Sequence, residues 1–212
     1  MNNDYLDWSL MYENRRATQR TFGDIWDLPI QKRHHKVIAL HGKPGLSWLE
    51  IGAGDRRLKQ ELETQWPLKS YKSFDIDQRH PHDFFSLHDI EGKYDRICMF
   101  EMIEHITIEH AKDVLSKCRE SLVPGGKLLI TTPNIYYPPG FLRDASHITP
   151  WAYDELGGLV RSADFEVIAI YRLYNDAFLR KIAHRYLLAP LHRFMGIDFS
   201  KQIMLVAELK QA

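Results

Sequence analysis

Two glycines and a carboxylate further along the chain have the types and spacing of a nucleotide-binding site. Gly52-Ala53-Gly54 follows an apolar run over residues 46–51 that is typical of a buried strand, and an amphipathic pattern begins directly after it. Glycine lets the backbone approach a ligand closely, and the first N–H groups of a helix are free to bind it. Asp75 lies 23 residues after Gly52, near the spacing at which nucleotide-binding βαβ units place an acid that accepts hydrogen bonds from ribose hydroxyls.

The glycine turn is incomplete as a nucleotide-binding motif. A dinucleotide fingerprint would have a third glycine at position 57, and a related pattern would have it at position 56, but both positions are arginine. A strand-to-helix turn that binds no ligand explains Gly52 and Gly54 equally well, and an aspartate at a strand end often only begins a turn. The turn and Asp75 together favour a nucleotide site, in which Asp55 is expected to cap the helix.

Histidines gather in the segment over residues 77–93, which contains His80, His82 and His88 together with several acids. A metal site there would be expected to show an H-E-x-x-H motif or a cysteine pair, and the segment has neither. Because loop histidines are usually only solvated, the sequence predicts no metal site. The segment is also too short for a full helix before the next strand.

The composition indicates a globular intracellular protein. Lys and Arg together number 28, as do Asp and Glu, so the formal net charge is zero and gives no overall electrostatic footprint for nucleic acid. Cys98 and Cys118 are too few for a disulfide framework and favour a reducing compartment. The N-terminus has acids where a signal peptide has bases, and no apolar run approaches the ~20 residues of a membrane span. We therefore expect a cytoplasmic location and no nucleic-acid partner.

Predicted strands and helices alternate along most of the chain. The apolar runs that predict strands lie at residues 46–51, 70–76, 94–100, 127–132, 164–173 and 202–209. This alternation indicates an α/β fold with a mostly parallel sheet. Residues 4–40 are expected to form two or three helices outside the sheet. Residues 176–195 combine helical character with several bases. The first interpretation of this segment is an outer layer of the fold, ahead of a lid or a peripheral membrane contact.

Five separated segments resemble the motifs of one family. LEIGAGDRRL resembles its first motif and FDID its acidic second motif, while YDRICMFEMIEHI is similar to a fourth-strand motif that ends in E-x-I-E-H. LVPGGKLLITTPN resembles the turn and strand that follow, and HITPWAYDELGGLVRSADFEVIAI a later segment. In this order and at these spacings, the segments resemble the class I S-adenosylmethionine-dependent methyltransferases, of the small-molecule type with the E-x-I-E-H pattern. The resemblance covers roughly residues 46–175.

The resemblance implies a Rossmann-like three-layer sandwich. Its sheet would have seven mostly parallel strands, with an antiparallel last strand inserted by a hairpin. One methyltransferase domain is expected over residues 1–212, with an N-terminal helical cap over 1–40, a core over 46–175 and a helical insertion over 176–200 in the last hairpin. S-adenosylmethionine is the implied cofactor.

The resemblance also implies which residues hold this cofactor. They are Glu50, Gly52, Ala53, Gly54, Asp75, Ile76, Asp83, Phe100 and Glu101. The first four would lie at the methionine and ribose, the next three at the ribose and adenine, and the last two at the end of the fourth strand. Asp75 would hold the ribose hydroxyls, and Asp83 matches the spacing of the family's acceptor for the adenine amino group. Arg56 stands where the family usually has glycine, so the loop would be tighter or Arg56 would meet the cofactor carboxylate.

On the acceptor side of the reaction, the resemblance implies that two histidines are candidates for a general base. His105 leads as general base because it follows a strand end near the expected methyl group, and His147 is second. A structural histidine near a helix start explains His105 equally well. The expected acceptor is a small molecule or a lipid- or sugar-linked group. A nicotinamide-dependent Rossmann oxidoreductase and a non-catalytic cofactor-binding protein are the alternatives, and the sequence leaves the oligomeric state open.

Overall fold

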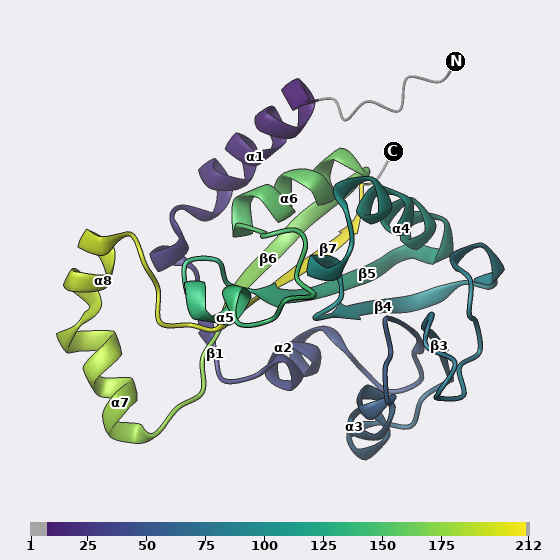
Figure 1. Ribbon diagram of the computed structural model, residues 1–212. Coiled ribbons are helices and arrows are strands. Elements are labelled where there is room, and N and C mark those ends of the chain that lie inside the picture. Colours follow the sequence, from purple (N-terminus) through teal and green to yellow (C-terminus); the bar gives the residue numbers. More distant parts are fainter. Residues whose placement is uncertain (1–7, 211–212) are drawn as a thin grey trace.

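The computed structural model describes residues 8–210. Seven strands form one sheet in the order β1-β6-β7-β5-β4-β2-β3 (Figure 1). Neighbouring strands are parallel except β7, which is antiparallel to both β5 and β6. The strands are β1 Ile30–Gln31, β2 Ser47–Ile51, β3 Ser70–Phe74, β4 Tyr94–Phe100, β5 Leu122–Pro133, β6 Phe165–Leu173 and β7 Gln202–Leu209. This confirms the expected fold class.

Helices cover both faces of the sheet (Figure 1). The α-helices are α1 Trp8–Phe22, α2 His34–His41, α3 Arg57–Gln65, α4 Ile108–Ser121, α5 Pro138–Leu142, α6 Tyr153–Ser162, α7 Phe178–Ile182 and α8 Ala189–Met195. In β4, Ile97 and Met99 pack in the core that includes α4 and α6, whereas Cys98 packs in the core that includes α2 and α3. Because both faces are buried, the strand reads as a continuous apolar run.

The N-terminal region contributes to the sheet as well as covering it. The prediction of helices outside the sheet is confirmed for α1 and α2 but wrong for residues 30–31, which pair in parallel with the end of β6. A two-residue strand is too short to show a period, so the sequence pattern did not reveal it. Residues 4–7 of the predicted region lie outside the described residues.

A tight helix pair attaches α1 to the domain. A Cβ on Gly157 of α6 would lie 2.6 Å from Cγ2 of Thr18, so only glycine permits this close approach. The guanidinium of Arg15 also pairs with the fully buried carboxylate of Asp154, at 2.7 Å.

The connection between β3 and β4 is short, as the sequence indicated. Residues 75–93 contain one helical element, a single 3-10 turn at Leu87–Asp89. Phe84 forms an isolated parallel bridge with Phe74, which folds the connection back against the end of β3. The region that would carry a full helix is therefore an irregular wall beside β3.

The last hairpin carries an insertion over residues 176–200. It contains α7, a π-helical turn over Ala183–Leu187 and α8, and it extends from the sheet at the left of Figure 1. Because β5 and β6 are both antiparallel to β7, they are parallel to each other, and the insertion leaves β6 at the carboxyl edge of the sheet. No helix among the described residues is long and apolar enough to cross a membrane.

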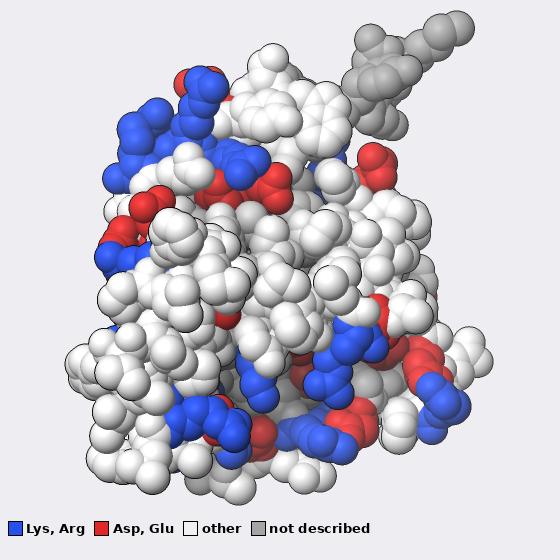
Figure 2. Space-filling view, turned by 60° about the vertical axis from the view of Figure 1, so that its left-hand side comes forward, with Lys and Arg blue, Asp and Glu red and all other residues white. Residues whose placement is uncertain are grey.

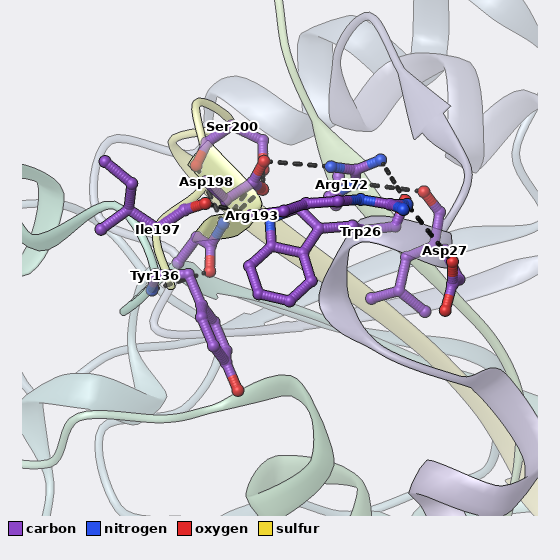
Figure 3. A network of polar contacts seen from close by, with 10 residues as sticks. Trp26, Asp27, Tyr136, Arg172, Arg193, Ile197, Asp198 and Ser200 are labelled. Carbon is purple, nitrogen blue, oxygen red and sulfur yellow. Dashed lines mark hydrogen bonds and ion pairs between the residues drawn. The ribbon is translucent and has the colours of Figure 1, made fainter. Parts of the chain in front are cut away.

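A buried polar network fixes the base of this insertion (Figure 3). Arg172 at the end of β6 pairs with Asp198 at 3.0 Å and donates to the carbonyl oxygen of Trp26 at 2.9 Å. The indole of Trp26 donates to the carbonyl oxygen of Ile197 at 2.9 Å. The return from α8 to β7 is therefore tied to the N-terminal segment, while the helices themselves project outward.

Candidate active site

An open cleft of about 1020 Å³ lies at the carboxyl ends of β2, β3 and β4. This is the edge at which open α/β sheets bind their ligands. The sequence-predicted residues in its walls are Gly52, Asp75, Ile76, Glu101 and His105. Glu50, Ala53, Gly54, Asp83, Phe100 and His147 stand outside those walls. The structure therefore brings one part of the predicted set to the cleft surface and places the rest around it.

The glycine turn has a backbone conformation that favours glycine. Gly52 and Gly54 have φ angles of +73° and +47°, in the left-handed region that L side chains rarely adopt. A Cβ on Gly52 would lie 2.5 Å from Cγ of Met102, whereas nothing lies within 4 Å of a Cβ built on Gly54. The turn thus leaves open space beside its second glycine, as a ligand-binding loop requires.

Asp75 is held in place by the same turn. Its carboxylate accepts hydrogen bonds from the backbone N–H of Gly54 at 2.7 Å and from that of Asp77 at 2.9 Å. These two bonds fix the carboxylate at the rim of the glycine turn and leave further lone pairs free for a ligand's hydroxyl groups. Beside it, the side chain of Ile76 is 80% exposed and offers an apolar surface to a flat ring.

Arg56 adopts a glycine-like backbone conformation without being glycine. It has a φ angle of +60° and precedes α3 at the N-cap position, so the expectation that Asp55 caps this helix is wrong. Its guanidinium donates to the carbonyl oxygen of Pro81 at 2.7 Å and lies over the ring of Tyr71, 5.5 Å from the centroid. The side chain is thus engaged with the β3–β4 connection and the face of β3.

Asp83 is separated from the cleft by its own contacts. Its carboxylate accepts from the backbone N–H of Ser73 at 3.0 Å and pairs with Lys72 at 2.9 Å and with Arg56 at 3.6 Å. These contacts fasten the β3–β4 connection to β3. Asp83 is not among the residues that line the cleft, and the adenine contact expected from its spacing stays a prediction.

Glu50, Ala53 and Phe100 lie behind the cleft walls. Glu50 is buried and accepts a hydrogen bond from the hydroxyl of Tyr71. Burial raises the pKa of Glu50 to about 7, against the opposing effects of Tyr71 and Arg56. Ala53 is buried in the glycine turn, and the ring of Phe100 packs beside the imidazole of His34, 5.4 Å away.

Two acids stand where β4 ends. Glu101 has a φ angle of +49°, and strained conformations of this kind cluster at functional sites. Glu104 is fully buried, with Oε2 accepting from the hydroxyl of Thr132 at 3.1 Å and Oε1 without a partner. Burial, together with the nearby charge of Glu101, raises the pKa of Glu104 to about 8. The sequence showed the Glu101-x-x-Glu104-His105 spacing but not this burial.

His105 and His147 are brought together from distant parts of the chain. Their ring centroids are 4.8 Å apart. The backbone N–H groups of Ile148 and Thr149 donate to the carbonyl oxygen of Glu104 at 2.8 and 3.0 Å, which docks the second histidine against the first. In residues 8–210, Glu104, His105 and His147 form a group whose potential ligand atoms lie within 4.8 Å of one another. This arrangement is able to accept a proton or to hold a cation.

Comparison with known proteins agrees with this geometry. A family model described as "Methyltransferase domain" matches residues 27–186. A SAM-dependent methyltransferase from Archaeoglobus fulgidus is similar in structure, with a TM-score of 0.62, 15% identity, and coverage of 95% of this chain and 99% of that chain. An S-adenosylmethionine-dependent methyltransferase from Mesorhizobium loti has a TM-score of 0.60 at 10% identity, covering 81% and 95%.

A third similar structure is the glycopeptide N-methyltransferase MtfA complexed with sinefungin, with a TM-score of 0.57, 14% identity, and coverage of 83% of this chain and 92% of that chain. At such identities the structural similarity shows the fold. A search of curated proteins gave no match. Because the family model spans most of the chain, the protein belongs to the methyltransferase-domain family.

Proposed function

We propose that this enzyme binds S-adenosylmethionine along the glycine turn and transfers its methyl group to a lipid-linked acceptor at a membrane surface. The observation that supports the binding mode is the shared cleft, whose lining includes Gly52 of the glycine turn, Asp75 and His105. The bound cofactor supplies an activated methyl group. The chain's own residues then need only to align the two reactants and exclude water.

Within this proposal, each cleft residue has a defined part. The carboxylate of Asp75 receives the ribose hydroxyls, because its anchoring bonds to Gly54 and Asp77 point it at the open side of the turn. The exposed side chain of Ile76 packs on the adenine. Gly54 leaves open space for the ribose and methionine chain, and Gly52 lets the turn pass close to Met102. Asp83 has no part in adenine recognition here, since its carboxylate is engaged by Lys72 and the backbone of Ser73.

Glu50, Ala53 and Phe100 act from behind the cleft in this proposal, and Glu101 acts from its wall. Glu50 supports the methionine amino end from beneath the glycine turn, and its burial beside Tyr71 keeps it fixed. Ala53 belongs to the turn itself, and Phe100 and Glu101 form the fourth-strand end that borders the cofactor. His105 and His147 serve the acceptor, with His105 first because it reaches the cleft wall.

The lipid-linked acceptor is supported by the surface of the insertion. Between Ala177 and Ile197 the chain has four Lys or Arg residues and no acid. Many of its apolar side chains are exposed, to 77% for Leu187 and 89% for Phe194, together with Phe178, Leu179, Ile182, Tyr186, Leu191 and Met195. Figure 2, with this side of the molecule turned forward, shows a wide area of uncharged atoms in which basic side chains are scattered.

Apolar side chains mixed with bases on short helices are typical of a segment that lies in the headgroup region of an anionic membrane. An exposed apolar surface of this extent is unusual on a monomer that binds nothing there. The insertion leaves the sheet at the carboxyl edge, which also carries the cleft. We therefore infer one domain over residues 1–212, in which the 176–200 insertion brings the cleft to a bilayer.

Ligand-dependent thermal stability tests the cofactor side of this proposal. S-adenosylhomocysteine binds only the folded state, so we expect it to raise the melting temperature in proportion to the logarithm of its concentration. NAD at the same concentrations is expected to leave the melting temperature unchanged. Stabilisation by NAD alone would instead support the oxidoreductase alternative. Binding of S-adenosylhomocysteine with no turnover on a panel of lipid-linked and small hydroxylated acceptors would support a non-catalytic protein.

A further inference from the structure

We propose that Glu104, His105 and His147 bind one divalent transition-metal ion on the acceptor side of the cleft. The ion's use rests on the proposed function, but its binding does not. One potential ligand atom from each residue lies within 4.8 Å of the others. Bound to one ion, these atoms would each lie at a metal–ligand distance of about 2.1 Å.

The hydrogen bonds of the two imidazoles leave the correct nitrogen free on each. Nδ1 of His147 faces the carbonyl oxygen of Phe141 at 2.8 Å, and Nδ1 of His105 faces that of Ser146 at 3.2 Å. A carbonyl oxygen only accepts, so these contacts assign the proton to Nδ1 on each ring. Nδ1 of His105 also lies 3.1 Å from the hydroxyl of Ser146, which donates to Asp144 at 2.7 Å and therefore accepts from the imidazole. In this tautomer Nε2 of each ring keeps its lone pair. Metal-binding histidines are usually oriented in this way, by a hydrogen bond from the nitrogen that does not bind the ion.

The carboxylate of Glu104 is incompletely satisfied without an ion. The side chain is fully buried, Oε2 accepts from Thr132, and Oε1 has no partner among the described residues. A buried oxygen without a partner is costly, and Glu101 brings a second, half-buried carboxylate near it. A bound cation would satisfy Oε1 and offset the repulsion between the two acids.

Backbone and side-chain hydrogen bonds hold the segments that carry these residues in place without an ion. The carbonyl oxygen of Glu104 accepts from the N–H groups of Ile148 and Thr149. The hydroxyl of Thr149 donates to the carbonyl oxygen of Ile106 at 2.7 Å. Three hydrogen bonds thus hold the loop that carries His147 against the segment that carries Glu104 and His105. Asp144 adds a further carboxylate 3.8 Å from Nε2 of His147.

Two imidazoles and one carboxylate suit ions such as Mn²⁺, Co²⁺ or Zn²⁺. Since His105 lines the cleft, a bound ion would be accessible to an acceptor there. A hydroxyl bound there would lose its proton to solvent more readily. Its oxygen would then form a bond to the methyl carbon while the carbon–sulfur bond breaks and its electron pair stays on sulfur. The histidines act as ligands in this arrangement, in place of the general base expected from the sequence.

Cobalt binding to the full-length protein tests this site. We expect Co²⁺ to give visible absorption bands that saturate at one equivalent, and Zn²⁺ to abolish them. His147→Ala and Glu104→Gln should each weaken Co²⁺ binding at least tenfold. His80→Ala is the matched control, because this exposed histidine lies outside the cleft, and it should leave the affinity unchanged.

A second measurement needs no variant to fold. Substoichiometric Mn²⁺ added to the wild-type chain should broaden the imidazole proton resonances of His105 and His147 before those of the other histidines. A wild-type chain that takes up no ion, or variants that bind Co²⁺ as tightly as the wild type, would overturn the metal site. S-adenosylhomocysteine stabilisation measured in the same samples keeps the two proposals apart. Metal binding without that stabilisation contradicts only the cofactor proposal, and the reverse contradicts only the metal site.

Discussion

Glu50 combines deep burial with a proposed part in cofactor binding. It is buried beneath the glycine turn, and burial raises its pKa to about 7, above the usual value of 4.5. The folded chain therefore holds a proton on Glu50 between these two values, whereas the unfolded chain does not. Because the native state binds more protons in this window, stability must fall as the pH rises from about 4.5 through about 7.

Glu50→Gln should accordingly stabilise the protein at high pH and weaken cofactor binding. At pH 8 the variant avoids burying a charge, so we expect its free energy of unfolding to exceed that of the wild type by on the order of 2 kcal/mol, and the difference to vanish near pH 4. Denaturant unfolding at several pH values measures this. Glu63→Gln, at an exposed site in α3, is the control. A variant that is less stable than the wild type at pH 8 contradicts the argument.

Arg56 tests whether the departure from the family's glycine pattern reaches the cofactor. Its guanidinium is engaged by Pro81, Asp83 and the ring of Tyr71. Arg56→Ala keeps the strained backbone and removes these contacts, so we expect a loss of about 1 kcal/mol in stability and less than a threefold change in S-adenosylhomocysteine affinity. Titration calorimetry checks the second value. A loss of tenfold or more would show that Arg56 meets the cofactor carboxylate after all.

At the scale of elements, the insertion over residues 176–200 has an unusual construction. Its base is fixed by the buried pair of Arg172 and Asp198, so it has a defined position relative to the sheet. Its helices are short and carry exposed apolar residues: Phe178 is 75% exposed and Leu179 is 78% exposed. Their inner side packs His184 and His192 against the ring of Phe199. Because helical segments shorter than about 12 residues depend on contacts for their stability, we expect the exposed apolar side to meet a partner as well.

Vesicle co-sedimentation measures whether a membrane supplies those contacts. We expect the wild type to bind vesicles of phosphatidylcholine mixed with phosphatidylglycerol, to bind phosphatidylcholine alone far less, and to be released by salt. Leu187→Asp combined with Phe194→Asp should reduce binding at least fivefold. Leu40→Asp, at an exposed apolar site on α2, should not. Self-association through this surface without vesicle binding would identify a second copy as the partner and contradict the proposal.

At the scale of the whole molecule, the sequence predicted the strands and connections that follow from local hydrophobic periodicity and segment length. The ranges of β4 and β7 agree with the predicted runs over 94–100 and 202–209, because each strand is buried and apolar throughout its centre. The shortened β3–β4 connection was also readable, since too few residues separate the strands for a helix. The glycine turn and Asp75 follow from motif spacing.

Long-range arrangement escaped prediction for physical reasons. The pairing of residues 30–31 with β6 depends on tertiary contacts such as the bond from the N–H of Arg172 to the carbonyl oxygen of Pro29. The orientation of Asp83 depends on a bond to Ser73 across a loop without regular structure. The meeting of His105 with His147 depends on two backbone bonds to Glu104. None of these leaves a periodic signal in the sequence.

The most direct test of the account is the affinity of S-adenosylhomocysteine for the wild type and for Asp75→Asn, measured by titration calorimetry. Hydrogen bonds to a charged group contribute about 1.5–3 kcal/mol, so we predict that the variant binds at least tenfold more weakly. The control is Asp89→Asn, in the same connection but outside the cleft walls, and it should bind like the wild type. Circular dichroism confirms that each variant is folded. Equal affinity in the wild type and Asp75→Asn would contradict the assignment of this cleft as the cofactor site.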